Sequence, residues 1–220
     1  MFKQAIAICM KDFQSELRNR YSINGLAMFI IVVISIIKFS LVDEKLTNEL
    51  HSGLLWIIIF FANSNGLARV FVAEEDRGTS FVLKLTANSK SVLLGKLIFN
   101  TSLSFIINFF VVFLFLVTMD LTIKSYGLFI LTLALGNFGL SGVLTIIAAL
   151  ISKSSSKGTL YPVLSFPLLL PLLLSTINAT TMTIEGTTIG QIGSEIQIMI
   201  SYSVVLITAS FMLFDLVWND

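Results

Sequence analysis

Six apolar stretches, each about as long as a lipid bilayer is thick, restrict the folds open to this chain more than any other feature of its sequence. They lie near residues 24–42, 53–72, 92–119, 126–151, 159–178 and 196–217. A helix needs about 20 residues to cross the hydrocarbon core, so the two longest stretches must tilt or extend into water. Soluble domains carry roughly 25% charged residues, whereas this chain carries 12%. We therefore predict an all-α integral membrane protein, in which residues 23–220 form one six-helix transmembrane domain.

The distribution of lysine and arginine predicts how the six helices are oriented. If the amino terminus is cytoplasmic, 11 of the 14 basic residues fall on the cytoplasmic side of the membrane. The other 3 are Lys38, Lys45 and Lys124. Cytoplasmic loops carry the excess of basic residues, so we predict a multi-pass protein of the bacterial inner (cytoplasmic) membrane with both termini in the cytoplasm. The net charge of +1 gives no reason to expect nucleic acid as a partner.

Residues 1–22 differ in kind from the six stretches, because charged residues are scattered through them. Their apolar residues recur at steps of three or four, which places on one helical face Phe2, Ile6, Cys9, Phe13, Leu17 and Tyr21. We expect an amphipathic helix in the plane of the membrane interface. The alternative is a helix that packs on the cytoplasmic face of the protein itself. The segment lacks the apolar run of a cleavable signal, so we expect the first span to act as an uncleaved one.

Motifs that would indicate an enzyme or a metal site are missing from the sequence. The pair Gly95–Lys96 lacks both the earlier glycine and the following serine or threonine of a phosphate-binding loop. His51 is the single histidine and Cys9 the single cysteine, whereas a metal site takes three or four ligands. We therefore expect no catalytic residue and no bound metal, with ATP hydrolysis in a separate subunit.

Polar residues inside the apolar stretches are expected to join the helices to each other. Hydrocarbon offers an amide or hydroxyl no partner, so such groups usually face a neighbouring helix; a substrate path is the alternative. The residues concerned are Asn63, Ser64, Asn65, Asn100, Asn108 and Asn137. Glycines also recur every third residue, at Gly136, Gly139 and Gly142. This pattern predicts close approach of a neighbouring helix.

All three prolines of the chain lie in the fifth stretch, at Pro162, Pro167 and Pro171 of YPVLSFPLLLP. Each one removes a backbone donor and frees a carbonyl one turn earlier. Lipid cannot satisfy these carbonyls. We therefore predict a strongly bent or broken helix that is buried against its neighbours or lines a cavity. Replacing Pro167 and Pro171 by alanine should then alter activity more than membrane insertion.

The densest group of charges, RVFVAEEDRGTSFVL at residues 69–83, lies between the second and third stretches. Gly78 can end the helix that leaves the second span, and Thr79 or Ser80 can cap a short amphipathic helix after it. Six spans, an interfacial amino-terminal helix and a structured cytoplasmic loop without an ATP site are together typical of one architecture. It is the membrane subunit of an ABC-2 (exporter-like) transporter, whose first cytoplasmic loop docks on a separate ATPase.

The segment LLWIIIFFANSNGLARVFVAEEDRGTSFVLKL, residues 54–85, resembles the signature of the haem exporter B family of cytochrome c maturation. In that signature a Leu-Trp pair opens the second span, and an Arg-x-Phe leads to acidic residues and a Gly-Thr pair. The matched positions are Trp56, Arg69, Phe71, Glu74, Asp76, Gly78, Thr79 and Lys96. The proline-rich fifth span and the early segment KDFQSELRNR are also similar to the family.

This resemblance implies a permease subunit of an ABC transporter for haem export in cytochrome c maturation. The implied partners are a cytoplasmic ATPase, a haem-handling membrane subunit, a small membrane accessory protein and a second copy of the permease. We expect no cofactor bound directly, and haem is implied as the ligand that the complex transports or hands on. Two alternatives stay open: a permease of this architecture for a lipid, drug or polysaccharide, and a scaffold that only relays ATP hydrolysis to a haem-chaperone complex.

We expect the charged loop to be the docking site of the ATPase. The predicted docking residues are Arg69, Phe71, Glu74, Glu75, Asp76, Gly78 and Thr79. The acids would pair with arginine or lysine of the ATPase, so charge reversal at Glu74 and Asp76 should release the ATPase without affecting membrane insertion. If the loop is only a solvated turn, the reversal has no effect on ATPase binding.

Overall fold

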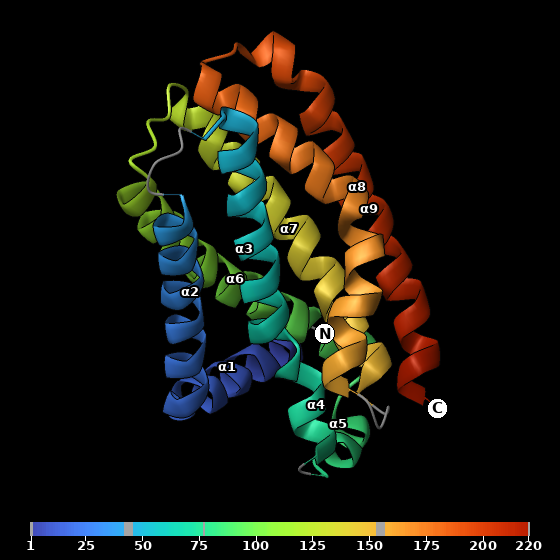
Figure 1. The fold of residues 1–220 in the computed structure, drawn as a ribbon. Coiled ribbons are helices and arrows are strands. Elements are labelled where there is room, and N and C mark those ends of the chain that lie inside the picture. The colour runs from blue at the N-terminus through green and yellow to red at the C-terminus, as the bar shows by residue number, and fades with distance from the viewer. Residues whose placement is uncertain (1, 42–45, 77, 153–156, 220) are drawn as a thin grey trace.

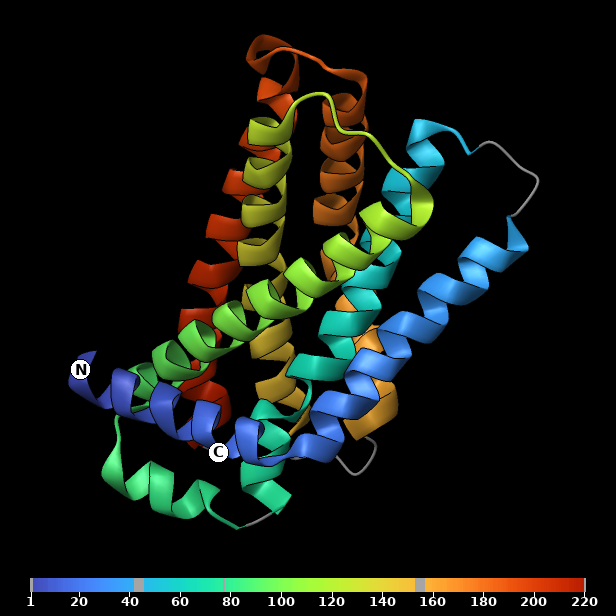
Figure 2. The ribbon, with the colours of Figure 1, turned by 90° about the vertical axis from the view of Figure 1, so that its left-hand side faces the viewer.

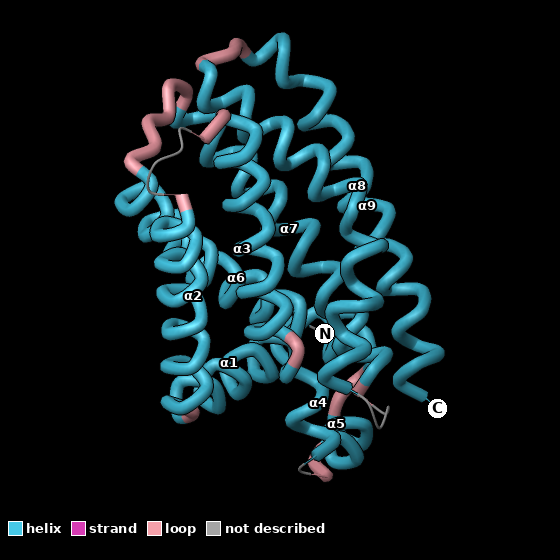
Figure 3. The backbone as a smooth tube through the Cα atoms, viewed as in Figure 1, coloured by secondary structure: helices cyan, strands magenta, loops and turns pink. Residues whose placement is uncertain are grey.

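The computed structural model describes residues 2–41, 46–76, 78–152 and 157–219, and the regular structure within these ranges is helical throughout. Short loops join the long helices (Figure 3). The helices are α1 (Phe2–Arg18), α2 (Arg20–Ser40), α3 (Asn48–Leu67), α4 (Arg69–Asp76), α5 (Ser80–Thr86), α6 (Ser89–Met119), α7 (Tyr126–Ile151), α8 (Lys157–Glu185) and α9 (Ile189–Asn219). The predicted all-α class is confirmed.

Within the described residues, six helical segments are long and apolar enough to cross a membrane. They are Arg20–Ser40, Asn48–Asp76, Ser89–Met119, Tyr126–Ile151, Leu160–Glu185 and Ile189–Asp215. These segments contain most of each predicted stretch, but the fifth continues well past residue 178. Two threonine hydroxyls in this extension donate to carbonyls three or four residues earlier on the same helix: Thr181 to Ile177 and Thr183 to Thr180. Polar side chains in the extension thus find hydrogen-bond partners within the helix itself.

α7 lies at the centre of the helix bundle, and α1 lies across one end of it (Figures 1 and 2). α7 packs against α3, α6, α8 and α9. Both termini are at the end that α1 crosses, where Trp218 of α9 contacts Phe71 of α4. We call this the terminal end. The short helices α4 and α5 extend beyond it (Figure 1).

The glycines of α7 allow three helices to pack closely against it. A β-carbon at Gly136 would lie 2.3 Å from the Trp56 ring of α3. One at Gly139 would lie 2.5 Å from Leu172 of α8. Such distances are shorter than a normal carbon contact, so a larger residue at these positions would require the neighbouring side chains to shift. The predicted packing role of the glycines is confirmed.

Three asparagines in the membrane-spanning part join α3, α6 and α7. Asn63 Nδ2 donates to Asn108 Oδ1 at 2.6 Å, and Asn108 Nδ2 donates to Asn137 Oδ1 at 2.8 Å. Ser104 Oγ lies 2.5 Å from the Oδ1 atoms of Asn63 and Asn137, so its single proton serves one of them at a time. The predicted joining role is confirmed for these three asparagines.

The other three polar residues of these helices lie in three different environments. Asn100 Nδ2 of α6 donates to Thr145 Oγ1 of α7 at 2.8 Å, as expected for a residue that joins helices. Ser64 is buried, and its hydroxyl has no partner among the described residues. Asn65 is exposed on α3. Asn65 therefore does not join helices within this chain, in contrast to the role expected for these polar residues as a group.

α8 continues as one helix through its three prolines. Pro167 and Pro171 are exposed, so the prediction that the proline segment lies inside the protein is wrong for them. The proline ring clashes with the preceding turn on its own side, and a helix therefore bends away from its prolines. Prolines on the outer face favour a helix that curves around α3 and α7, against which α8 packs. Within this stretch, Leu168 O also accepts a hydrogen bond from Tyr202 Oη of α9 at 2.6 Å, which joins α8 to α9.

Candidate functional site

α4 and α5 form a short helical hairpin at the terminal end, with its turn at Gly78 (Figure 1). Gly78 has a φ of +65°, a left-handed conformation that glycine adopts without steric cost. The amide of Gly78 donates to Glu75 O, and the amide of Thr79 donates to Glu74 O. This pair of bonds is the Schellman pattern of a helix end. The prediction that Gly78 ends the helix is confirmed. Thr79 precedes α5, but its hydroxyl donates back to Glu74 O at 3.3 Å and does not cap α5.

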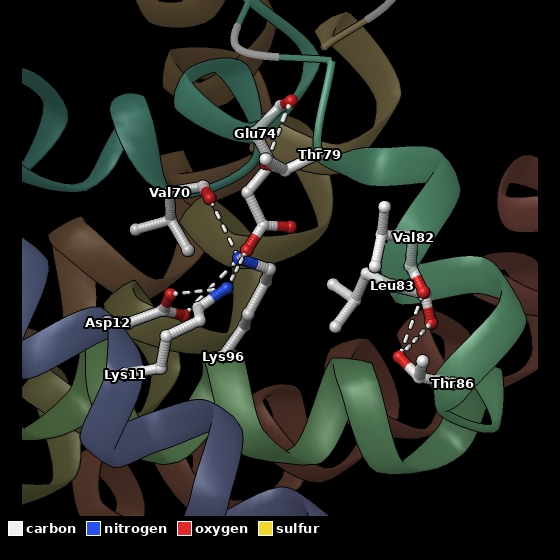
Figure 4. A network of polar contacts seen from close by, with 9 residues as sticks. All are labelled: Lys11, Asp12, Val70, Glu74, Thr79, Val82, Leu83, Thr86 and Lys96. Atoms are coloured by element: carbon white, nitrogen blue, oxygen red, sulfur yellow. Dashed lines mark hydrogen bonds and ion pairs between the residues drawn. The ribbon is translucent and has the colours of Figure 1, made fainter.

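Glu74 points from α4 toward the helix bundle, where it meets two lysines (Figure 4). Its Oε1 atom lies 3.1 Å from Lys96 Nζ of α6 and also accepts a hydrogen bond from Lys11 of α1. Asp12 of α1 contacts the same two lysines, each at 3.2 Å. Two lysines and two carboxylates from three helices thus form one cluster of balanced charge. We call Lys11, Asp12, Glu74 and Lys96 the charged cluster.

Lys96 lies at the centre of the charged cluster and is fully buried. Besides the two carboxylates, its Nζ donates to the backbone carbonyl of Val70 at 2.8 Å. Two protons of the ammonium group serve the hydrogen bonds to Asp12 and Val70, and Glu74 adds an ion pair. The Nζ also lies 4.8 Å from the centre of the Phe71 ring, within the range of a cation–π contact. A buried cation is tolerated when it is paired and hydrogen-bonded in this way.

Burial and the charges of the cluster together shift the pKa values of two groups on α1. Burial lowers the pKa of Lys11, but the hydrogen bond to Glu74 and the charges of Asp12 and Glu74 raise it above the ordinary lysine value overall. Lys11 is therefore charged at neutral pH. Burial, and then the charge of Asp12, raise the pKa of the Cys9 thiol. A thiol with a raised pKa reacts slowly, because the thiolate is the reactive form.

Aromatic side chains near the end of α9 also contact the hairpin. Phe71 of α4 contacts the rings of Phe214 and Trp218, with ring centres 5.6 and 6.3 Å away. Trp218 stacks on Phe214 and lies 5.7 Å from the Nζ of Lys84 of α5. We call Phe71, Phe214 and Trp218 the aromatic cluster. It connects the hairpin to the last turns of the chain.

The outer face of the hairpin is exposed and carries both apolar and acidic side chains. On α5, Phe81 is 66% exposed and Leu85 is 72% exposed. On α4, Glu75 and Asp76 are exposed. Large apolar side chains exposed together mark a surface that binds another protein or the membrane.

A groove of about 1190 Å³ separates α1 from the hairpin. Its walls come from α1, α4 and α5 and from Gly66 and Phe99 of the adjoining helices. Glu74 lines this groove, and its Oε2 atom has no hydrogen-bond partner among the described residues. The groove is the open space next to the charged cluster.

The structure separates the residues that the sequence grouped as one docking site. Glu75, Asp76, Gly78 and Thr79 are exposed on the hairpin, whereas Phe71 and Glu74 are buried under it. The side chain of Arg69 lies outside the part of the chain that the structure describes. The prolines of α8 belong to the membrane-spanning part and not to this site.

Sequence reasoning missed that Lys11, Asp12 and Trp218 belong to the site. Each lies more than 50 positions from Glu74, and only the fold brings them together. Lys96 carried a visible signal, because it is a lysine near the start of a long apolar stretch. Such a lysine must find carboxylates or water.

The described residues contain no group of three or more histidine, cysteine, aspartate or glutamate side chains placed to hold a metal ion. The ring of His51 lies instead with Nδ1 at 3.0 Å from Thr47 O and with its edge near the Phe115 ring. The chain was also compared with known proteins. A family model described as "CcmB protein" matches residues 3–214. No curated protein matches the chain.

Proposed function

The chain belongs to the CcmB protein family, which the match over residues 3–214 shows, and from this premise we propose that it is the permease subunit of an ABC transporter, with the α4–α5 hairpin as the docking site of the ATPase. The family is a membrane component of haem export for cytochrome c maturation. The protein is accordingly a multi-pass membrane protein with six apolar helices. The hairpin is the observation that carries the proposal, because its helix α5 lies outside the six membrane-spanning segments and exposes apolar side chains.

The proposed docking surface is the outer face of the hairpin. Phe81 and Leu85 would enter an apolar groove of the ATPase, and Glu75 would meet a basic residue at the rim. Glu74 supports this surface from inside, since its carboxylate is already bound to Lys11 and Lys96. Reversing the charge of Glu74 would therefore disturb the internal cluster as well as the surface. Glu75 and the two apolar residues are better test positions.

We place the hairpin and both termini on the cytoplasmic side of the bacterial inner membrane. The charge distribution supports this orientation, as 11 of the 14 basic residues then lie inside. The remaining proposed partners are a haem-handling membrane subunit, a small membrane accessory protein and a second copy of the permease. We propose that α1 lies in the membrane interface, because Phe2, Ile6 and Leu17 are exposed on it.

Haem is the ligand that we expect the complex to handle, either by passage through the permease or by release from a haem-binding partner. The interior between α3, α6 and α7 favours the second role for this subunit. Asn63, Asn108 and Asn137 fill that interior and bond to one another. Their amides are therefore engaged in holding helices together and not in lining an open path. A subunit of this kind transmits ATP-driven movement to its partners.

The docking proposal is tested by replacing Phe81 and Leu85 together with serine. Removing an apolar anchor from the centre of an interface costs about 2 kcal/mol or more, roughly a thirtyfold loss of affinity. We expect the double variant to insert in the membrane normally and to lose the ATPase during co-purification. Lys90→Ala, an exposed substitution next to the hairpin, serves as the control and should retain the ATPase. Undiminished co-purification with the double variant would contradict the proposal.

A further inference from the structure

We propose that Lys96 is a positioning residue that joins the docking hairpin to α1 and α6, so that movement of the hairpin carries α1 with it. The inference rests on the proposed docking of the ATPase on the hairpin. It adds the route by which a force on the hairpin would reach the rest of the protein. The charged cluster is the physical connection.

One ammonium group connects three separate helices. Lys96 itself belongs to α6, and its Nζ contacts Glu74 Oε1 of α4 at 3.1 Å and Asp12 Oδ2 of α1 at 3.2 Å (Figure 4). The third contact, to Val70 O at 2.8 Å, holds the backbone of α4 directly. A shift of α4 away from the bundle would leave a buried charge without its partners. Such a separation is strongly unfavourable, so the three helices are expected to move together.

α1 is held to α6 by close packing as well as by charge. A β-carbon at Gly95 would lie 2.7 Å from Ala5 O and 3.0 Å from the β-carbon of Ile8. The backbone of α1 thus rests on α6 one residue before Lys96. α1 and α4 have no comparable packing, since α4 packs mainly against α7. The charged cluster is therefore the main link between α1 and the hairpin.

Lys11, at the exposed edge of the charged cluster, also contributes to the link between α1 and the hairpin. It contacts the same two carboxylates as Lys96, but its own side chain is half exposed. Water can therefore replace Lys11 as a partner, whereas it cannot reach the buried Lys96. This difference assigns the positioning role to Lys96.

Cys9 provides a native probe for the attachment of α1. It is the single cysteine of the chain and is buried in α1, the helix that packs against α6. The test compares Lys96→Met with Lys90→Met, which makes the same change at an exposed position of the same helix. In membranes that contain the ATPase, we expect Cys9 to react with a small maleimide at least tenfold faster in Lys96→Met. Lys90→Met should react like the unchanged protein.

Co-purification separates this inference from the docking proposal. We expect the ATPase to remain bound to Lys96→Met, while cytochrome c maturation falls at least tenfold. Unchanged Cys9 reactivity together with unchanged maturation would overturn the positioning role. Loss of the ATPase from the Phe81→Ser/Leu85→Ser variant tests docking alone, and its outcome does not depend on Cys9.

A triple variant distinguishes the positioning role of Lys96 from a simple effect on folding. Asp12→Asn, Glu74→Gln and Lys96→Met together remove Lys96 and both carboxylates that it contacts; Lys11 keeps its charge, but its side chain is half exposed, so water can hydrate it. We expect this triple variant to insert and to bind the ATPase, but to remain defective in maturation. Recovery of full maturation would show that the cluster serves stability only, and it would overturn the proposal.

Distance measurements between spin labels show directly whether α1 moves together with the hairpin. In a Cys9→Ser background, labels at Gln14 of α1 and Val82 of α5 both lie at exposed positions. We expect the same narrow distance distribution with and without ATP, because α1 follows the hairpin. Lys96→Met should broaden the distribution in the presence of ATP. A distance that changes with ATP in the unchanged protein would contradict coupled movement.

Discussion

At Gly136 the absence of a side chain lets α7 meet two other helices at one point. A β-carbon there would lie 2.3 Å from the Trp56 ring of α3 and 2.9 Å from Thr176 of α8. Trp56 cannot retreat easily, because its Nε1 donates to Thr180 Oγ1 at 2.8 Å and its ring is fully buried. Overpacking of this kind typically costs about 1–3 kcal/mol. We therefore predict that Gly136→Ala lowers the midpoint temperature of unfolding in detergent.

Gly127→Ala is the matched control for that measurement. It makes the same substitution in the first turn of α7, where nothing lies within 4 Å of the added carbon. Alanine also favours helix over glycine. The control should be as stable as the unchanged protein or more so, and a Gly136→Ala variant of equal stability would count against the packing argument.

The residue scale also shows what a single sequence can and cannot predict. The spacing of Gly136, Gly139 and Gly142 indicated their packing role, because periodicity is a local property of one helix. The direction of Glu74 was not predictable in the same way. Glu74 and Glu75 are adjacent acids in one charged loop, yet Glu74 is buried on Lys96 and Glu75 is exposed. Only the path of α6 and α1 past α4 decides between them.

At the scale of elements, the sequence of α8 predicted how its prolines affect the backbone but not where these prolines lie in the fold. The sequence indicated freed carbonyls and a bend, and both follow from the proline ring alone. It did not indicate which face of α8 carries the prolines. Leu169 and Leu172 are fully buried on the opposite face, and Pro167 and Pro171 are exposed.

We predict that Pro167→Ala/Pro171→Ala leaves membrane insertion unchanged but lowers cytochrome c maturation. The two alanines restore two backbone donors, so α8 should straighten and fit less well around α3 and α7. Leu168→Ala/Leu170→Ala changes exposed residues of the same stretch without altering the backbone, and it serves as the control. Equal maturation in both double variants would argue against a role for the bend.

At the scale of the whole molecule, properties summed over the sequence predicted the number and the orientation of the spans, which no single residue indicates. The number of spans depends on segment length and polarity, and six segments of the described chain meet both conditions. The orientation depends on the sum of basic residues at each end. Lys38 and Lys124 lie at the end opposite to the charged cluster, with Lys124 Nζ 3.4 Å from Glu185 O beyond the last turn of α8.

The orientation gives a prediction for the complete protein in its membrane. Reporter fusions at Asn48 and Asp120, which lie at the far ends of α3 and α6, should give an external signal. Ser154 is a predicted internal position but lies outside the described residues, so Thr86 at the end of α5 is the better internal site. The reverse orientation exchanges all three signals and would place the hairpin where no cytoplasmic ATPase can reach it. A cytoplasmic signal at Asn48 would therefore contradict the topology and the docking proposal together, whereas loss of docking alone would leave the topology intact.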